Sequence, residues 1–108
     1  MKMIDIEYNI VKWRKDTFPN VTIEGTKKKL LEECCELIAA IVSGDDEATL
    51  EELVDVFISG ASHVHKTGVC SFGTTTGTLT EATLKKMDLN NSRVFGKEDE
   101  NGDRPRER

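Results

Sequence analysis

The sequence has few of the residues that build β-sandwiches. Aromatic residues make up only 6% of the 108 residues, and proline occurs only 2 times. Charged residues, by contrast, account for 32% of the chain. This composition favours helices that pack through aliphatic side chains over a sheet-based core. The fold is therefore predicted to be all-α.

Long apolar runs and an excess of positive charge are also missing. No segment approaches the roughly 18 consecutive apolar residues of a membrane-spanning helix. The N-terminal segment MKMIDIEYNIVKWRKD carries acids where a signal peptide needs an uninterrupted apolar stretch. The net charge of −5 argues against the broad basic face of a general nucleic-acid binder. We therefore expect a soluble, cytoplasmic protein with neither a membrane nor a nucleic acid as partner.

Cysteine does not provide a disulfide scaffold. The chain has 3 cysteines, an odd number, and Cys34 and Cys35 are neighbours within a predicted helix, where their side chains diverge. A chain of 108 residues is long enough for one domain, although burial in an oligomer would add usefully to its stability. Residues 1–96 are predicted to form this domain. The charged segment 97–108 has no apolar residues to bury and is predicted to be disordered.

Apolar periodicity and capping residues predict four helices. The first covers residues 3–16 and ends before Phe18-Pro19-Asn20, and the fourth covers residues 79–92. The second runs from about Lys27 to Val42, with Thr26 as N-cap, and the third from about Ala48 to Lys66. Gly44 fits the left-handed position that ends many helices. The second and third helices should therefore form an antiparallel hairpin.

Acidic residues occur in mirrored pairs on the two sides of Gly44. Glu33 and Glu36 are three residues apart, as are Glu52 and Asp55, so each pair lies on one side of its helix. Folding the chain at Gly44 brings the two pairs level with each other. Four carboxylates so close together repel one another unless a hard cation with oxygen ligands neutralises them, Mg²⁺ before others. The pattern predicts a magnesium site made of Glu33, Glu36, Glu52 and Asp55.

Local charge does not explain these acids as a solvated surface. Surface helices usually place lysines four residues from glutamates, yet no Lys or Arg occurs between Glu32 and Asp55. The alternative interpretation, two acidic helix faces that only keep the protein in solution, remains open on the pattern alone. A diiron bundle is disfavoured because neither His63 nor His65 follows an acid by three residues.

The order of motifs resembles a known family. The segments LLEECCEL and EELVDVF, followed by Lys86-x-x-x-Asn90-x-x-Arg93, are similar to the MazG-like all-α nucleoside triphosphate pyrophosphohydrolases over about residues 10–96. The resemblance implies a four-helix MazG-like bundle, completed by assembly into a homodimer or homotetramer. In that superfamily the E-x-x-E and E-x-x-D pairs hold Mg²⁺, with Mn²⁺ as a possible substitute.

The resemblance also implies a reaction and its residues. Water would attack the α-phosphorus of an NTP or dNTP and give the monophosphate and pyrophosphate. Glu32 or Glu33 would orient and deprotonate that water. Substrate contacts would come from an aromatic residue for the base and from later basic and amide residues for the phosphates, namely Trp13, Lys86, Asn90 and Arg93.

Two other functions remain open from the sequence. One is a phosphoribosyl-ATP pyrophosphohydrolase, which acts on a related bond within the same fold. The other is a non-catalytic helical dimerisation or regulatory module. A saturable Mg²⁺ titration separates the enzymes from the module, because only the enzymes need the carboxylates for a cation.

Overall fold

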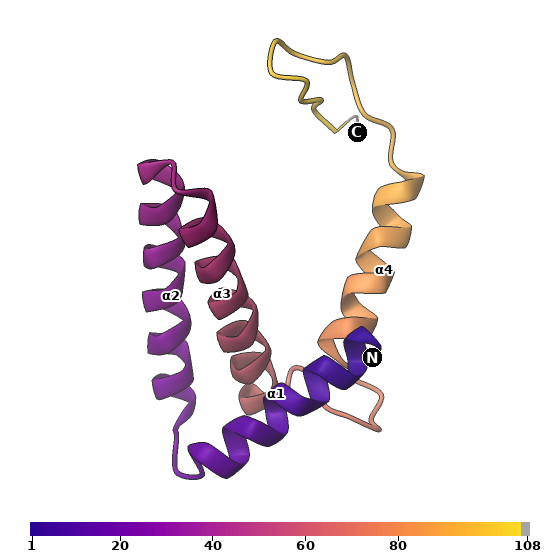
Figure 1. The fold of residues 1–108 in the computed structure, drawn as a ribbon. Helices are drawn as coiled ribbons and strands as arrows, with labels where there is room; N and C mark the ends of the chain where they lie inside the picture. The colour runs from indigo at the N-terminus through magenta and orange to yellow at the C-terminus, as the bar shows by residue number, and fades with distance from the viewer. Residues whose placement is uncertain (107–108) are drawn as a thin grey trace.

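The computed structural model describes residues 1–106, which form four α-helices joined by short connections (Figure 1). Within these residues the only β-type pairing is an isolated bridge between Phe95 and Arg106. The all-α prediction is confirmed. The helices are α1 (Met3–Thr17), α2 (Ile23–Ser43), α3 (Asp46–Thr67) and α4 (Leu79–Ser92).

Helices α2 and α3 lie side by side as an antiparallel hairpin and make the largest helix–helix contact in the molecule (Figure 1). Gly44 ends α2 with φ of 76°, a conformation that costs residues with a Cβ atom appreciable energy. Asp45 then caps α3, because its side chain accepts a hydrogen bond from the Ala48 N–H at 3.0 Å. The hairpin predicted around Gly44 is confirmed.

The predicted start of the second helix is wrong by one turn. Thr22, not Thr26, is the N-cap of α2, and its hydroxyl oxygen accepts a hydrogen bond from the Gly25 N–H at 3.0 Å. Thr26 lies inside the helix, where its hydroxyl donates to the Ile23 carbonyl and contacts His63 Nδ1 at 2.8 Å. Gly25 in the first turn made the earlier start hard to recognise, since glycine weakens a helical pattern.

Glu7 connects three of the four helices. Its side chain, on α1, is completely buried, and it accepts hydrogen bonds from the backbone N–H groups of Leu79 at 2.8 Å and Thr80 at 2.7 Å. The Thr80 hydroxyl and His65 Nε2, on α3, also contact this carboxylate. Burial raises the pKa of Glu7, but the hydrogen bonds from Thr80, His65 and Leu79 outweigh burial and lower the pKa below 4.5. Glu7 thus fixes the N-terminus of α4 against α1 and α3.

The Gly- and Thr-rich connector at residues 68–77 folds back on the helices. The Ser71 N–H donates to the Gly77 carbonyl at 2.7 Å, which closes the connector into a loop. Phe72 stacks on His65 with ring centroids 4.9 Å apart, and its edge meets Tyr8 at 5.4 Å. These contacts hold the connector next to the buried Glu7.

Helix α4 points away from the α2–α3 hairpin and packs chiefly against α1 (Figure 1). The radius of gyration is 16.5 Å, whereas a compact chain of this length measures about 13 Å. Only a few apolar side chains are buried, and many large ones on α2, α3 and α4 are exposed. The single chain is therefore an open arrangement of helices.

Two further features of the chain bear on the predictions above. None of the helices in residues 1–106 has the length and apolar character required to span a membrane. The C-terminal segment forms turns around Asp99, whose carboxylate accepts hydrogen bonds from the Asn101 and Asp103 N–H groups. Residues 107 and 108 of the tail predicted to be disordered lie outside the described residues.

Candidate metal centre

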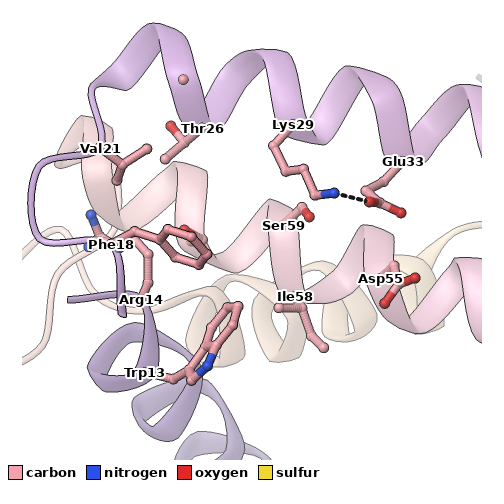
Figure 2. A pocket seen from close by; sticks show the side chains of 12 residues that line it. Trp13, Arg14, Phe18, Val21, Thr26, Lys29, Glu33, Asp55, Ile58 and Ser59 are labelled. Carbon is pink, nitrogen blue, oxygen red and sulfur yellow. Dashed lines mark ion pairs between the residues drawn. The ribbon is translucent and has the colours of Figure 1, made fainter. Parts of the chain in front are cut away.

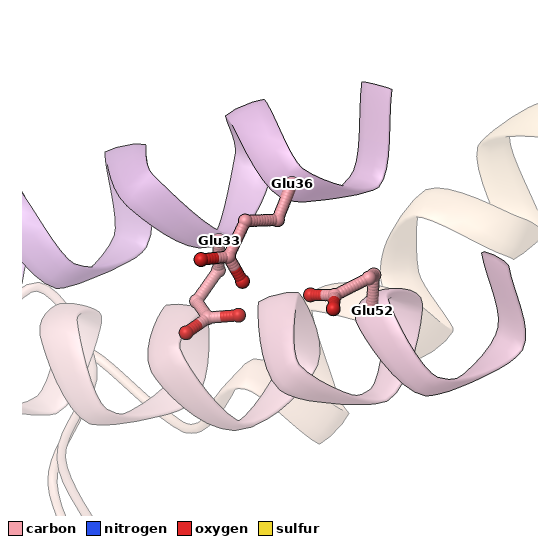
Figure 3. Close-up of side chains that lie close together, drawn as sticks. All are labelled: Glu33, Glu36 and Glu52. Atoms are coloured by element: carbon pink, nitrogen blue, oxygen red, sulfur yellow. The ribbon is translucent and has the colours of Figure 1, made fainter. Parts of the chain in front are cut away.

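Three glutamates from the α2–α3 hairpin meet at one point (Figure 3). Glu33 and Glu36 on α2 and Glu52 on α3 each offer a carboxylate oxygen, and these oxygens all lie within 4.8 Å of one another. The three-residue spacing on α2 places both of its glutamates over the same side of α3. We call Glu33, Glu36 and Glu52 the acidic cluster.

Two oxygens of the acidic cluster are buried without a partner. Glu33 is only 4% exposed, and its Oε2 has no hydrogen-bond partner. The Oε2 atom of Glu52 is also buried and also has no hydrogen-bond partner. Leaving a buried carboxylate oxygen unpaired costs more than leaving a neutral one unpaired. Desolvation, and then the neighbouring carboxylate of Glu36, raise the pKa of Glu52 to about 7. Within residues 1–106, no positively charged group of the protein therefore pairs with these two oxygens.

One local cation partly compensates the cluster. Lys29 Nζ lies 2.7 Å from Glu33 Oε1, four residues along the same helix (Figure 2). This ion pair lowers the pKa of Glu33 and raises that of Lys29. From Glu32 to Asp55 the sequence contains no Lys or Arg, which indicated acids without local compensation. That interpretation is wrong for Glu33, since its cation lies just outside that range.

Asp55 and Glu32 are placed differently from the acidic cluster. Asp55 does not belong to the group of oxygens within 4.8 Å. It lies on the next turn of α3 and faces the same cavity as Glu33 (Figure 2). The charge of Asp55 still contributes to the raised pKa of Glu52. Glu32 is exposed and lies outside both the cluster and the cavity.

A cavity of about 720 Å³ adjoins the acidic cluster between α1, α2 and α3 (Figure 2). We call it the main cavity. Glu33, Asp55 and Lys29 form its charged end. Its other end is largely apolar and includes Trp13 and Phe18, whose rings meet edge to face with centroids 5.6 Å apart. Ligand pockets typically measure about 300–1,000 Å³, so the main cavity can accept a molecule with one apolar end and one end that carries a cation or a metal-bound anion.

The remaining predicted substrate residues lie elsewhere. Lys86, Asn90 and Arg93 are on or directly after α4, and none of them lines the main cavity. Arg93 Nη1 donates a hydrogen bond to Asn90 Oδ1 at 2.8 Å, so these two side chains do lie together. Within one chain the structure thus brings Trp13 to the main cavity and leaves the α4 group apart from the acidic cluster.

Lys29 and Arg14 differ in how far the sequence indicates their place at the main cavity. Lys29 has a signal, because a lysine one turn before Glu33 and near a helix start, where positive charge is disfavoured, hints at a phosphate contact. Arg14 had none: it is only 6% exposed, yet the sequence places it among charged residues at the end of a helix. For Phe18, which also lies at the cavity, the sequence indicates only a place in the segment that ends the first helix.

The donor set of the acidic cluster fits a divalent cation. Hard divalent ions take carboxylate oxygens, and the unpaired oxygens of Glu33 and Glu52 are of this kind. Fold and site together define an all-α protein with a carboxylate centre of the type that binds a divalent metal beside a ligand cavity. Comparisons with known proteins place it within that class.

The chain belongs to the MazG family. A family model described as "MazG nucleotide pyrophosphohydrolase domain" matches residues 21–94, more than half of the chain. This membership supports a hydrolase activity on the phosphoanhydride bonds of nucleotides. The resemblance inferred from the sequence motifs is confirmed.

A solved structure agrees with this assignment. The chain is similar to a cyanophage S-2L MazG-like pyrophosphohydrolase, described as bound to dGDP and three catalytic Mn²⁺ ions per active site. The identity is 25%, the TM-score is 0.62, and the match covers 100% of this chain and 99% of the phage protein chain. No curated protein matches the chain. The similarity supports a divalent metal cofactor and a nucleotide ligand.

Proposed function

We propose that the protein is a Mg²⁺-dependent nucleoside triphosphate pyrophosphohydrolase that converts an NTP or dNTP to the monophosphate and pyrophosphate. The observation that carries the proposal is the pair of buried, unpartnered carboxylate oxygens of Glu33 and Glu52 beside the main cavity. An acidic face that served only solubility would expose these oxygens to water. Their burial is costly unless a cation joins them.

The metal would be held by the acidic cluster together with Asp55. Glu33, Glu36 and Glu52 already converge, and Asp55 lies one turn further along α3 on the same cavity. Mg²⁺ suits a site of carboxylate oxygens that leaves positions open to water and phosphate, and Mn²⁺ suits the same ligands. When bound, the metal would offset the negative charge that grows on the departing pyrophosphate.

The chain's own carboxylates would prepare the water for attack. In this reaction the water oxygen bonds to the α-phosphorus, the bond to the bridging oxygen of the β-phosphate breaks, and a proton passes to a glutamate. Glu33 is the nearer candidate for that proton because it lies at the main cavity, whereas Glu32 is exposed one residue before it. Lys29, now paired with Glu33, is within one helical turn of the same place and would contact a phosphate oxygen.

The apolar end of the main cavity would hold the base. Trp13 is 50% exposed and meets Phe18 edge to face, so one face of its ring stays available for a base. The triphosphate would then extend along α2 and α3 toward Glu33 and Asp55. This orientation matches the apolar and charged ends of the main cavity.

A second copy of the chain would complete the site. Lys86, Asn90 and Arg93 suit phosphate through a point charge, an amide donor and a planar fork of donors. Because α4 points away from the hairpin, these residues would reach a nucleotide only in a neighbouring subunit (Figure 1). We therefore propose a homodimer or homotetramer in the cytoplasm, where nucleoside triphosphates are abundant.

Pyrophosphate release tests this proposal. The protein would be assayed with each ribo- and deoxyribonucleoside triphosphate and with phosphoribosyl-ATP, with Mg²⁺, with Mn²⁺ and with chelator. We expect pyrophosphate from at least one triphosphate, only with a divalent ion, and at least a hundred-fold loss of rate in Glu52→Gln. Turnover of phosphoribosyl-ATP alone would identify the other enzyme of this fold. No release from any substrate would leave a non-catalytic module.

A further inference from the structure

A second cavity, of about 320 Å³, lies where the C-terminal ends of α1 and α3 meet the Phe18-Pro19 turn. We call it the basic cavity. Its lining residues are Arg14, Lys15, Phe18, Pro19, His65 and Lys66, and none of them is acidic. In a chain with a net charge of −5, such a concentration of positive groups is unusual. The volume is at the lower end of the range for ligand pockets, which indicates a small ligand.

Arg14 is the central residue of the basic cavity. It is 6% exposed, and its Nε is buried without a hydrogen-bond partner. No ion pair in residues 1–106 involves Arg14. A buried guanidinium normally has a carboxylate or several carbonyl groups as partners, because its five donors are costly to leave unpaired. Arg14 thus presents unused donor capacity at the edge of this cavity.

The other cations are not neutralised either. Neither Lys15 nor Lys66 forms an ion pair within the described residues. The nearest buried acid, Glu7, contacts His65 and is already saturated by hydrogen bonds from Leu79 and Thr80. The ends of α1 and α3 add partial negative charges of about half a unit each. These dipoles explain why two lysines are tolerated here, but they leave a positive surplus around Arg14.

We propose that the basic cavity binds a small phosphate-type oxyanion, at a site separate from the acidic cluster. Arg14 would supply a planar fork of donors, while Lys15 and Lys66 would supply two flexible ammonium groups. Phe18 and Arg14 line both cavities, so the two sites share a wall. The ligand is a free phosphate or pyrophosphate ion, or the phosphate group of a nucleotide. The proposal does not depend on the enzymatic activity proposed above.

Calorimetry of the full chain in the presence of chelator tests the proposal. The probes are inorganic phosphate, pyrophosphate and AMP, and the absence of divalent ions prevents phosphate binding through a metal at the acidic cluster. Lys15→Gln and Lys66→Gln remove charges that line only the basic cavity, and neither lysine forms an ion pair within residues 1–106 that the substitution would break. Lys28→Gln, at an exposed position of α2 that lines neither cavity, and Lys12→Gln, on the exposed side of α1, are matched controls.

We expect saturable binding of one anion per chain, weakened about three-fold to ten-fold by each of Lys15→Gln and Lys66→Gln. The two control variants should bind as the parent protein does. Tighter binding of AMP than of phosphate, with the same sensitivity to Lys66→Gln, would identify a nucleotide phosphate as the ligand. Absence of saturable binding by all three probes would overturn the proposal, as would equal weakening by Lys28→Gln or Lys12→Gln.

Discussion

At the residue scale, the acidic cluster is an arrangement that the metal-free protein only partly stabilises. Lys29 pairs with one oxygen of Glu33, while the second oxygen of Glu33 and one of Glu52 stay buried and unpaired. Glu52 responds to its neighbours by holding a proton more tightly, which lowers the repulsion. A cation would remove the need for this proton.

The raised pKa of Glu52 predicts how metal binding depends on pH. Metal must displace the proton of Glu52, so affinity should fall as the pH drops below about 7, and uptake at lower pH should release a proton. Calorimetric titration in two buffers of different ionisation enthalpy, at pH 6 and pH 8, measures this release. A proton count of zero at pH 6 would show that Glu52 is already ionised and would contradict the prediction.

The same shift has a consequence for the stability of the metal-free protein. Between pH 4.5 and about 7, folded Glu52 keeps a proton that the unfolded chain has lost. Folding stability attributable to this group therefore declines as the pH rises through that window. The variant Glu52→Gln should flatten this part of the stability profile in urea unfolding, whereas Glu51→Gln, at an exposed position of α3, should leave it unchanged.

Part of the acidic cluster could be predicted from residue spacing alone. The three-residue spacing and the mirror relation about Gly44 depend only on helix geometry, which is why Glu33, Glu36 and Glu52 meet as expected. The position of Asp55 outside the acidic cluster could not be predicted. It depends on the relative rotation of α2 and α3, which decides which turn of α3 faces Glu33 and Glu36. The burial of Arg14 had no signal either, since it depends on tertiary packing, and Arg14 lines the basic cavity together with Phe18 and Pro19.

At the element scale, Glu7 acts as a cap supplied by another helix. Its carboxylate accepts from the first backbone N–H groups of α4, which have no partner within their own helix. A negative charge at this end of a helix is also favoured by the helix dipole. The position of α4 relative to α1 and α3 therefore depends on one buried side chain.

Replacing Glu7 by glutamine should destabilise the fold by about 2 kcal/mol, because the amide group would face backbone donors with a donor of its own. The pKa of Glu7 is lowered from 4.5, so its stabilising effect is complete above that value and is lost as the pH falls through the folded pKa. Urea unfolding at pH 7 and at acidic pH measures both effects. Glu100→Gln, in the exposed C-terminal turn, is the control. An unchanged unfolding midpoint in Glu7→Gln would disprove the capping role.

Two of the glycines in the hairpin, Gly44 and Gly60, allow a matched comparison. Gly44 has φ of 76° and open space around it, so Gly44→Ala should cost about 1 kcal/mol from backbone strain alone. Gly60 is inside α3, and an added Cβ would meet Leu30 Cδ1 at an ordinary 3.8 Å. Gly60→Ala should therefore be neutral or stabilise by up to about 1 kcal/mol. Thermal unfolding of both variants checks the opposite signs, and destabilisation by Gly60→Ala alone would refute the expectation.

Helix existence was easier to predict than helix boundaries. Gly44 is a strong local signal, and it ends α2 where the sequence indicated. Asp45 and Thr78, which are of residue types favoured at N-caps, cap α3 and α4. The start of α2 was missed because Thr22 and Thr26 are both acceptable caps. The choice between them depends on a tertiary contact, the pairing of Thr26 with His63 on α3.

At the scale of the whole molecule, the open shape of the single chain favours assembly. Large apolar side chains are exposed on both members of the hairpin and on α4, for example Ile38 at 62%, Leu50 at 64% and Leu84 at 62%. An unusually large exposed apolar surface usually marks an interface. Light scattering should give two or four times the chain mass of 12.1 kDa. A monomeric mass at micromolar concentration would count against the assembly.

Mixing inactive variants tests whether α4 completes the site of another subunit. Glu36→Gln removes a proposed metal ligand of the acidic cluster, and Lys86→Ala removes the proposed phosphate contact on α4. In mixed dimers one of the two sites regains both residues, so refolding the variants together should restore about a quarter of the parental rate. Mixing Glu36→Gln with Glu52→Gln should restore nothing. Failure of the first mixture to regain activity would place α4 in its own chain's site.

The shape of the whole molecule was the least predictable level. The sequence indicated a four-helix domain but contained no local signal for the direction of α4, which depends on the burial of Glu7 at its N-terminus. The sequence pattern of apolar residues on α4 is the same whether these residues pack against their own chain or against another copy.

The central claim, that Glu33, Glu36 and Glu52 hold a divalent cation, is tested most directly by calorimetric titration of the protein with Mg²⁺ and Mn²⁺ at pH 8. We predict saturable uptake by the parent protein, at least ten-fold weaker binding by Glu36→Gln with helicity retained, and no change in Glu51→Gln. Absence of saturable uptake at millimolar metal, or equal binding by the parent protein and Glu36→Gln, would contradict the claim.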